Sequence, residues 1–177
     1  MIRIEPLSSS PEVCKALGEI LVEVVAHGGS VHFMHPLDLE TASEFWRGSL
    51  AAAERGERII LGAYDGDQLV ATVSLLLNTP PNQPHRAEIG KMMTRVSHRG
   101  RGIAKALLRE AERLAVERGR TMLMLDTAAE DGASRLYEAV GYNLAGIIPD
   151  YAYKPHGGLT GSMYYWKRLG EAPDFRS

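Results

Sequence analysis

The feature that most constrains the fold is a strand–helix–strand pattern in the second half of the chain. Residues 87–96 and 121–125 read as strands, and residues 102–118 between them carry apolar side chains at helical spacing. A helix that connects two strands of one sheet makes them parallel, with a right-handed crossover. The fold is therefore expected to contain one parallel strand pair with a helix packed on it.

The segments around this unit favour antiparallel pairing. Residues 58–64 and 69–77 read as strands, and Asp65-Gly66-Asp67 between them is a typical hairpin turn. The remaining predicted strands are 1–7, 142–148 and 163–169, with a loop rich in Pro and Gly before the last one. The remaining predicted helices run from Ser10–Pro11 to about His27, from Asp38 to Arg55, and over 132–140. The fold class is thus α/β, with a mixed, mostly antiparallel sheet of about six to seven strands flanked by helices on both faces.

Composition limits the function classes. The 177 residues fit a single domain, 1–177, and 45% hydrophobic residues are enough to build a core. A net charge of −2 argues against general electrostatic binding to nucleic acid or to membranes. The first ten residues lack a signal-peptide pattern, and Cys14, the only cysteine, cannot form an internal disulfide. We therefore expect a cytoplasmic protein.

The most informative loop joins residues 87–96 to the helix that follows. It contains Gly100 and Gly102, and the basic residues Arg99, Arg101 and Lys105 lie beside them. The first turn of a helix leaves four backbone N–H groups without partners, and these attract an anion. Glycines allow a phosphate to approach the backbone. The loop therefore predicts a phosphate site.

Other interpretations of this loop stay open at this point. The two glycines could simply permit a tight turn. A nucleotide P-loop is excluded, because no Gly-Lys-Ser/Thr follows at the required spacing. A dinucleotide-binding fold is a rival, since Asp126 ends the next strand at about the right distance. That motif needs a third glycine, which this chain lacks.

Two segments resemble the GNAT family of N-acetyltransferases. Residues 99–104 match its Arg/Gln-x-x-Gly-x-Gly/Ala signature, and residues 135–142 (Arg-Leu-Tyr-Glu-Ala-Val-Gly-Tyr) are similar to its Leu-Tyr-Glu-x-x-Gly-Phe/Tyr segment. The predicted order of elements is also that of the family. The resemblance implies an enzyme that transfers an acetyl group from acetyl-CoA, as co-substrate, to an amine.

The resemblance also implies how acetyl-CoA is held. The loop amides would bind the pyrophosphate, and the preceding strand would pair with the pantetheine arm as if with an added strand. One of the two methionines in that strand is expected to pack inward. Residues 128–131 stand where many members carry an asparagine that contacts the cofactor, so that contact is not expected here. The cofactor-binding residues implied are Met92, Met93, Thr94, Arg99, Gly100, Arg101, Gly102, Ile103, Ala104 and Lys105.

Acetyl transfer needs a base for the amine and an acid for the departing thiolate. Glu88 is one candidate base, because it precedes Arg99 by the spacing of a catalytic glutamate in related acetyltransferases; it could equally be a strand carboxylate paired with Arg86 or Lys91. Asp126 is the second candidate. Tyr137 matches the tyrosine that serves as acid in much of the family, and backbone amides near Met93 would stabilise the oxyanion where the parallel strands separate.

The acceptor is expected to be a small polar amine. Residues 27–35, Leu125-Asp126-Thr127 and the end of the chain are similar to the tabtoxin-resistance acetyltransferases, which implies an amino-acid-like toxin or antibiotic. The resemblance allows a homodimer, for which the sequence specifies no interface. The histidines at 27, 32 and 35 lack a metal-binding pattern, so no metal is expected. The alternative function is an acyl-CoA-binding module without catalytic activity.

Overall fold

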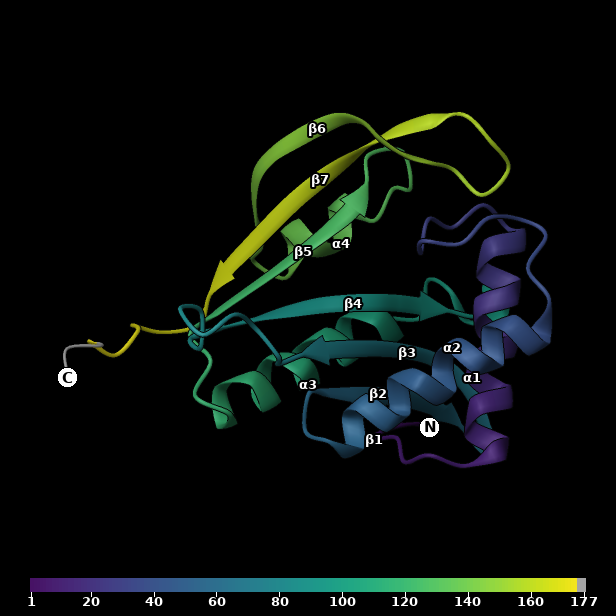
Figure 1. The fold of residues 1–177 in the computed structure, drawn as a ribbon, viewed down its shortest axis with the longest axis horizontal. Helices are drawn as coiled ribbons and strands as arrows, with labels where there is room; N and C mark the ends of the chain where they lie inside the picture. The colour runs from purple at the N-terminus through teal and green to yellow at the C-terminus, as the bar shows by residue number, and fades with distance from the viewer. Residues whose placement is uncertain (175–177) are drawn as a thin grey trace.

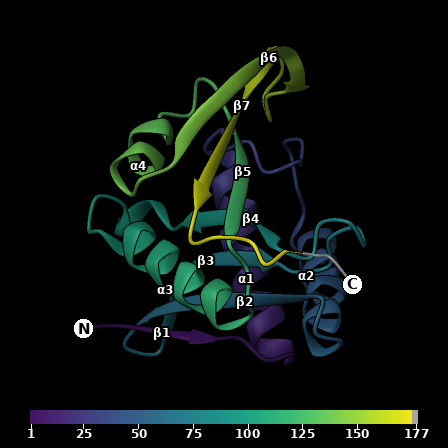
Figure 2. The same ribbon diagram turned by 90° about the vertical axis from the view of Figure 1, so that its left-hand side faces the viewer.

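The structure, a computed structural model, describes residues 1–174 and consists of one seven-stranded sheet with helices on both faces (Figures 1 and 2). The strands are β1 (Ile2–Pro6), β2 (Arg58–Asp65), β3 (Gln68–Leu76), β4 (Arg86–Thr94), β5 (Met122–Ala128), β6 (Asn143–Tyr153) and β7 (Leu159–Arg168). The α-helices are α1 (Pro11–Ala26), α2 (Leu39–Glu54), α3 (Ile103–Glu117) and α4 (Ser134–Ala139), and a short 3-10 turn covers Val96–His98. None of the described helices is long and apolar enough to cross a membrane.

The strand order is β1-β2-β3-β4-β5-β7-β6, and β4 with β5 is the parallel pair among the described strands. This confirms the predicted mixed, mostly antiparallel sheet and the crossover through α3. The helix starts also follow the sequence signals. Ser10 caps α1 by accepting the N–H of Val13, and Asp38 caps α2 by accepting the N–H of Thr41.

Each face of the sheet carries its own core. The helices α3 and α4 cover one face and α1 and α2 cover the other (Figure 2). Leu107 and Leu108 of α3 pack on the first face, and the fully buried Trp46 of α2 packs on the second. The sheet is therefore a rigid layer between two apolar clusters.

The loop predicted before the last strand is present but shorter than expected, and covers residues 154–158. Most of residues 149–162 pair as strand, because β6 continues to Tyr153 and β7 already begins at Leu159. Pro149 is tolerated since β6 is an edge strand, where a missing N–H breaks no ladder. The register shifts between Ile148 and Ala152, and Asp150 within this bulge has a φ of 50°.

Two features of β4 create the space for a site. The parallel pairing with β5 covers only Arg86↔Met122, Ala87↔Leu123 and Glu88↔Met124, after which the strands diverge (Figure 1). The pairing of β4 with β3 then jumps from Ser74↔Gly90 to Thr72↔Met93. Between these pairs β4 has one residue more than β3, and this extra residue forms a bulge that changes which side chains face each core.

Candidate active site

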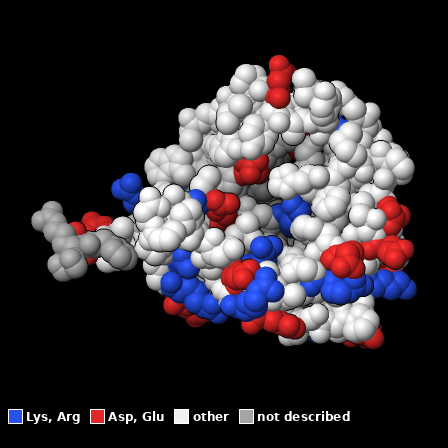
Figure 3. Space-filling view, viewed as in Figure 1, with Lys and Arg blue, Asp and Glu red and all other residues white. Residues whose placement is uncertain are grey.

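A cavity of about 780 Å³ lies where β4 and β5 separate. Its walls are the loop after α1, the second half of β4, the end of β5, the segment leading into α4, and the β6–β7 hairpin. The space-filling view shows this face hollowed, with acidic and basic side chains around the hollow (Figure 3). The predicted separation of the parallel strands is therefore present.

The bulged part of β4 lines one wall. Met92, Met93 and Thr94 all border the cavity, as the predicted pantetheine strand requires. Met93 is 2% exposed and packs with α1 and α2, whereas Met92 packs against the opposite core. The expectation that one of the two methionines packs inward is confirmed.

The glycine loop ends at the N-terminus of α3. Gly100 and Gly102 have φ of 73° and 76°, which favour glycine, and a Cβ on either would meet no atom within 4 Å. The helix ladder begins with Ala106 donating to Gly102, so the amides of residues 103–105 have no backbone acceptor among the described residues. An anion can therefore approach this helix end directly.

The basic side chains of the loop have different positions. Arg99 borders the cavity and donates to the carbonyl of Thr94 at 3.4 Å. Arg101 instead forms an ion pair with Asp65 at 3.3 Å. Of these two predicted cofactor residues, the structure thus brings Arg99 to the cavity and Arg101 to the end of β2.

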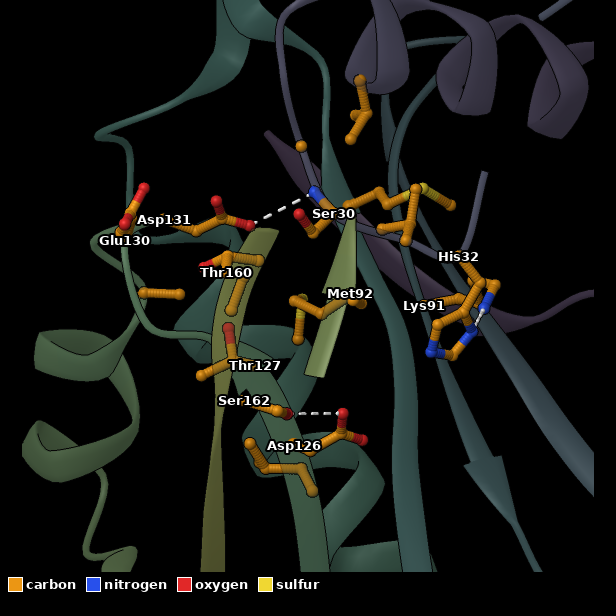
Figure 4. A pocket seen from close by; sticks show the side chains of 18 of the residues that line it. Ser30, His32, Lys91, Met92, Asp126, Thr127, Glu130, Asp131, Thr160 and Ser162 are labelled. Atoms are coloured by element: carbon orange, nitrogen blue, oxygen red, sulfur yellow. Dashed lines mark hydrogen bonds between the residues drawn. The ribbon is translucent and has the colours of Figure 1, made fainter. Parts of the chain in front are cut away.

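Asp126 enters the cavity from the β5 side. Its Oδ2 accepts a hydrogen bond from Ser162 Oγ at 3.0 Å, so β7 fixes the carboxylate (Figure 4). Its other oxygen makes no hydrogen bond with the described residues. The carboxylate can accept a proton from a molecule in the cavity.

Tyr137 reaches the same cavity from α4. It is 6% exposed and its ring packs against those of Tyr142 and Tyr165, both with centroids 5.9 Å away. Burial, together with the negative charges of Asp126 and Asp131, raises the pKa of Tyr137 to about 12. The phenol is therefore protonated at neutral pH and can donate.

Glu88 lies at the closed end of the cleft, in the last residue pair between β4 and β5. Its carboxylate accepts a hydrogen bond from Arg86 at 2.6 Å, and it is not among the residues that border the cavity. The structure thus brings Asp126 and Tyr137 together around one cavity and places Glu88 beside Arg86.

Sequence reasoning missed two contributions to the cavity. Lys91 projects from the bulge and donates to His32 Nδ1 at 2.8 Å (Figure 4). Asp131, in the segment without the family's asparagine, accepts the backbone N–H of Ser30 at 3.2 Å and so bridges the cavity rim (Figure 4). A lysine in a strand carries no sequence signal for a bulge, so Lys91 could not be singled out.

The histidines at 27, 32 and 35 do not converge. His27 Nδ1 bonds its own helix at the carbonyl of Glu23, His32 contacts Lys91, and the ring of His35 lies 4.4 Å from that of His156. Within residues 1–174, no group of three or more His, Cys, Asp or Glu side chains is arranged to hold a metal.

The residues present fit acetyl-CoA. The open space above Gly100 and Gly102 is what a pyrophosphate needs, and the backbone of 92–94 runs along the cavity with β3 paired on one side and no strand paired on the β5 side. Bound here, acetyl-CoA would supply the acetyl thioester.

Comparison with known proteins agrees with this geometry. Residues 28–142 match the model of the Acetyltransferase (GNAT) family. An uncharacterized N-acetyltransferase of Bacillus subtilis, YsnE, is 33% identical over 120 residues, which are 65% of this chain and 73% of that protein. The N-acetyltransferase 8F1 of Rattus norvegicus is 34% identical over 86 residues, or 48% of this chain. The matched region spans 39% of that rat protein's length.

The fold has solved counterparts. The structure of yncA from Salmonella typhimurium, a putative acetyltransferase with its cofactor acetyl-CoA, superposes with a TM-score of 0.82 at 17% identity, covering 98% of this chain and 99% of that one. Both signature segments, 99–104 and 135–142, lie within the residues that the family model matches. This chain belongs to the GNAT acetyltransferase family.

Proposed function

We propose that this chain is an N-acetyltransferase that moves the acetyl group of acetyl-CoA to the amine of a small molecule. The observation that carries the proposal is the convergence of Asp126 and Tyr137 on one cavity between diverging parallel strands. The glycine loop at the start of α3 supplies the neighbouring phosphate site. Family membership supports the same reaction.

Each residue has a distinct role in this proposal. An amine such as that of lysine has a pKa of about 10.4, so freeing its lone pair at pH 7 costs roughly 4–5 kcal/mol. Asp126 accepts that proton, directly or through water, as the nitrogen attacks the thioester. Backbone N–H groups near Met93 stabilise the oxyanion, and Tyr137 returns a proton to the departing thiolate.

Asp126 is favoured over Glu88 as the base. Asp126 borders the cavity with one oxygen fixed by Ser162, whereas Glu88 is bound by Arg86 at the closed end of the cleft. A base must come within hydrogen-bond reach of the proton it removes. Glu88 acts instead as a strand carboxylate that neutralises Arg86.

The acceptor in this proposal is small. The β6–β7 hairpin covers one side of the cavity, and its tip contacts the end of α1 through His156 Nε2, which donates to the carbonyl of Ala26 at 2.9 Å. A closed rim of this kind favours a compact molecule over a protein tail. The sequence similarity to tabtoxin-resistance acetyltransferases supports an amino-acid-like toxin or antibiotic as the acceptor.

Release of free thiol from acetyl-CoA, measured with a broad panel of amines, tests the proposal. Tyr137→Phe is expected to lower kcat about 100-fold or more while the Kd for acetyl-CoA changes less than twofold. Tyr142→Phe is the matched control, because Tyr142 is also buried and its hydroxyl has no partner among the described residues. Asp126→Asn should lower kcat far more than Glu88→Gln.

Calorimetric titration with acetyl-CoA and, separately, NAD decides the cofactor. Binding of acetyl-CoA alone is expected. Binding of NAD alone would show that the glycine loop belongs to a dinucleotide-binding site. If acetyl-CoA binds but no amine releases thiol, the chain is an acyl-CoA-binding module. Unchanged turnover in Tyr137→Phe would remove Tyr137 from the mechanism.

A further inference from the structure

The bulge in β4 places a lysine ammonium against the cavity. Lys91 has a φ of 48°, a backbone conformation that residues with a Cβ rarely adopt. Non-glycine residues in this region cluster at functional sites, where the surrounding structure holds them. Here the bulge directs the Lys91 side chain to the face covered by α2, with Nζ 5.4 Å from the ring centroid of Phe45.

No carboxylate among the described residues forms an ion pair with the ammonium, although the charge of Asp126 across the cavity opposes part of the effect of burial on the pKa of Lys91. The hydrogen bond of the ammonium goes to His32 Nδ1, and none of the ion pairs within residues 1–174 includes Lys91. Burial lowers its pKa to about 8, so the group is still mostly charged at pH 7. A lysine has three donor hydrogens, and His32 uses one of them.

His32 is suited to orient the Lys91 ammonium, because it accepts a hydrogen bond from it and carries no positive charge of its own. Burial, and then the charge of Lys91, lowers the pKa of His32, so its ring is neutral at pH 7. A neutral Nδ1 that accepts from Lys91 leaves the positive charge on the lysine. The remaining donors of Lys91 are available to a molecule in the cavity.

Opposite charges thus border the cavity from two sides. Asp126 with Ser162 lies on the β5 and β7 side, and Lys91 with His32 lies on the β4 side (Figure 4). Arg99 also borders the cavity, but it lies at the glycine loop, where the phosphates are expected. Lys91 is therefore the basic residue placed to meet the acceptor.

We propose that Lys91, oriented by His32, is a subsite for a carboxylate of the acceptor. The acceptor is then a zwitterion whose ammonium approaches Asp126 and whose carboxylate binds Lys91. This inference rests on the proposed function, because it defines the acceptor of the same cavity. A partly buried ammonium without an ion pair gains from a small anion, since burial strengthens the attraction between the charges.

Matched pairs of acceptors test the subsite. The probes are glycine, β-alanine, γ-aminobutyrate and the common L-α-amino acids, each compared with its own carboxamide, which lacks the negative charge. For the best acceptor, wild-type protein should show kcat/KM roughly 10- to 100-fold higher for the acid than for the amide. Lys91→Met should bring this ratio close to one, and Lys91→Arg should retain part of it.

Lys15→Met is the control, because Lys15 lies on the exposed side of α1 and its ion pair among the described residues is with Glu19, at 3.9 Å. It should keep the wild-type ratio. Preference for the carboxamides, equal use of acids and amides, or a ratio that persists in Lys91→Met would each overturn the subsite.

A binding measurement distinguishes failure of the carboxylate subsite from failure of the proposed transferase activity. If no amine of any charge is acetylated, the transferase proposal fails, and the CoA complex is titrated with the N-acetyl derivatives of the same acids and amides. Binding of an N-acetyl acid that is lost in Lys91→Met but kept in Lys15→Met would support an anion subsite. Absence of binding by every N-acetyl acid would overturn it.

Discussion

At residue 91 the structure holds an ammonium partly out of water, with no carboxylate at ion-pair distance and only the more distant charge of Asp126 to offset its own. The hydrogen bond to His32 and the contact with Phe45 compensate only in part, and the pKa of about 8 measures the remaining cost. One pKa unit corresponds to about 1.4 kcal/mol. A residue that costs stability in the free protein and faces a cavity is typical of a site arranged for a ligand.

Lys91→Met should therefore stabilise the free protein. At pH 7 the lysine is protonated in both the folded and unfolded states, so the full cost of about 1–3 kcal/mol is present and the variant removes it. As pH rises from about 8 to 10.5, the folded protein loses this proton before the unfolded chain does. The stability of wild type relative to the variant then recovers.

Urea unfolding of both proteins at pH 7 and at pH 10.5 measures this difference. The gap between their free energies of unfolding should shrink at the higher pH. A variant less stable than wild type at pH 7 would show that the packing of Lys91 outweighs its desolvation.

At the scale of elements, the sequence predicts best where the local signals are strong. The helix α3, its glycine loop and the parallel crossover follow from spacing and from Gly100 and Gly102, whose left-handed conformation is a local property of the chain. The bulge at Lys91 depends on how β4 pairs with β3, which no local pattern records. The full length of the β6–β7 hairpin could not be predicted for the same reason. Pro149 suggests a loop unless the strand that contains it is known to lie at the edge of the sheet.

The two ends of α3 provide a controlled test of the phosphate site. Gly102 precedes the helix and Gly119 follows it, with φ of 76° and 71°, and a Cβ on either would meet no atom within 4 Å. Alanine at either position should cost about 1 kcal/mol of stability through backbone strain. Only Gly102→Ala places a methyl group where the pyrophosphate would bind.

Acetyl-CoA affinity by calorimetry, with thermal unfolding as the stability measure, separates the two effects. Gly102→Ala should weaken binding at least tenfold, and Gly119→Ala should leave it within twofold. Similar affinities of the two variants for acetyl-CoA would show that the cofactor phosphates do not bind at the N-terminus of α3.

At the scale of the whole molecule, the sheet is two halves joined by a short seam. Only three residue pairs connect β4 with β5, and the halves meet again at the far end of the cleft through the tip of the β6–β7 hairpin. There the N–H of His35 donates to the carbonyl of Pro155 at 2.9 Å, and the ring of His35 packs on His156. The cleft is thus closed at one end by strands and at the other by side chains and loops.

His156→Ala should loosen the second closure and leave the first intact. The variant loses the hydrogen bond to Ala26 and the ring contact with His35, and because His156 is exposed the cost in global stability should stay below about 1 kcal/mol. Amide hydrogen exchange of residues 27–35 and 154–158 should accelerate while exchange in β4 and α3 stays unchanged. The KM for the acceptor should rise severalfold, because the loop after α1 forms one wall of the cavity.

His85→Ala is the matched control, since His85 lies at the strand-closed end, where its carbonyl accepts the N–H of Thr121. It should leave exchange at residues 27–35 as in wild type. Uniform acceleration across the sheet in His156→Ala would show that the hairpin tip supports the whole fold. Unchanged exchange at residue 35 would show that the backbone bond to Pro155 holds the rim without the histidine pair, and that the two halves are joined by main chain at both ends of the cleft.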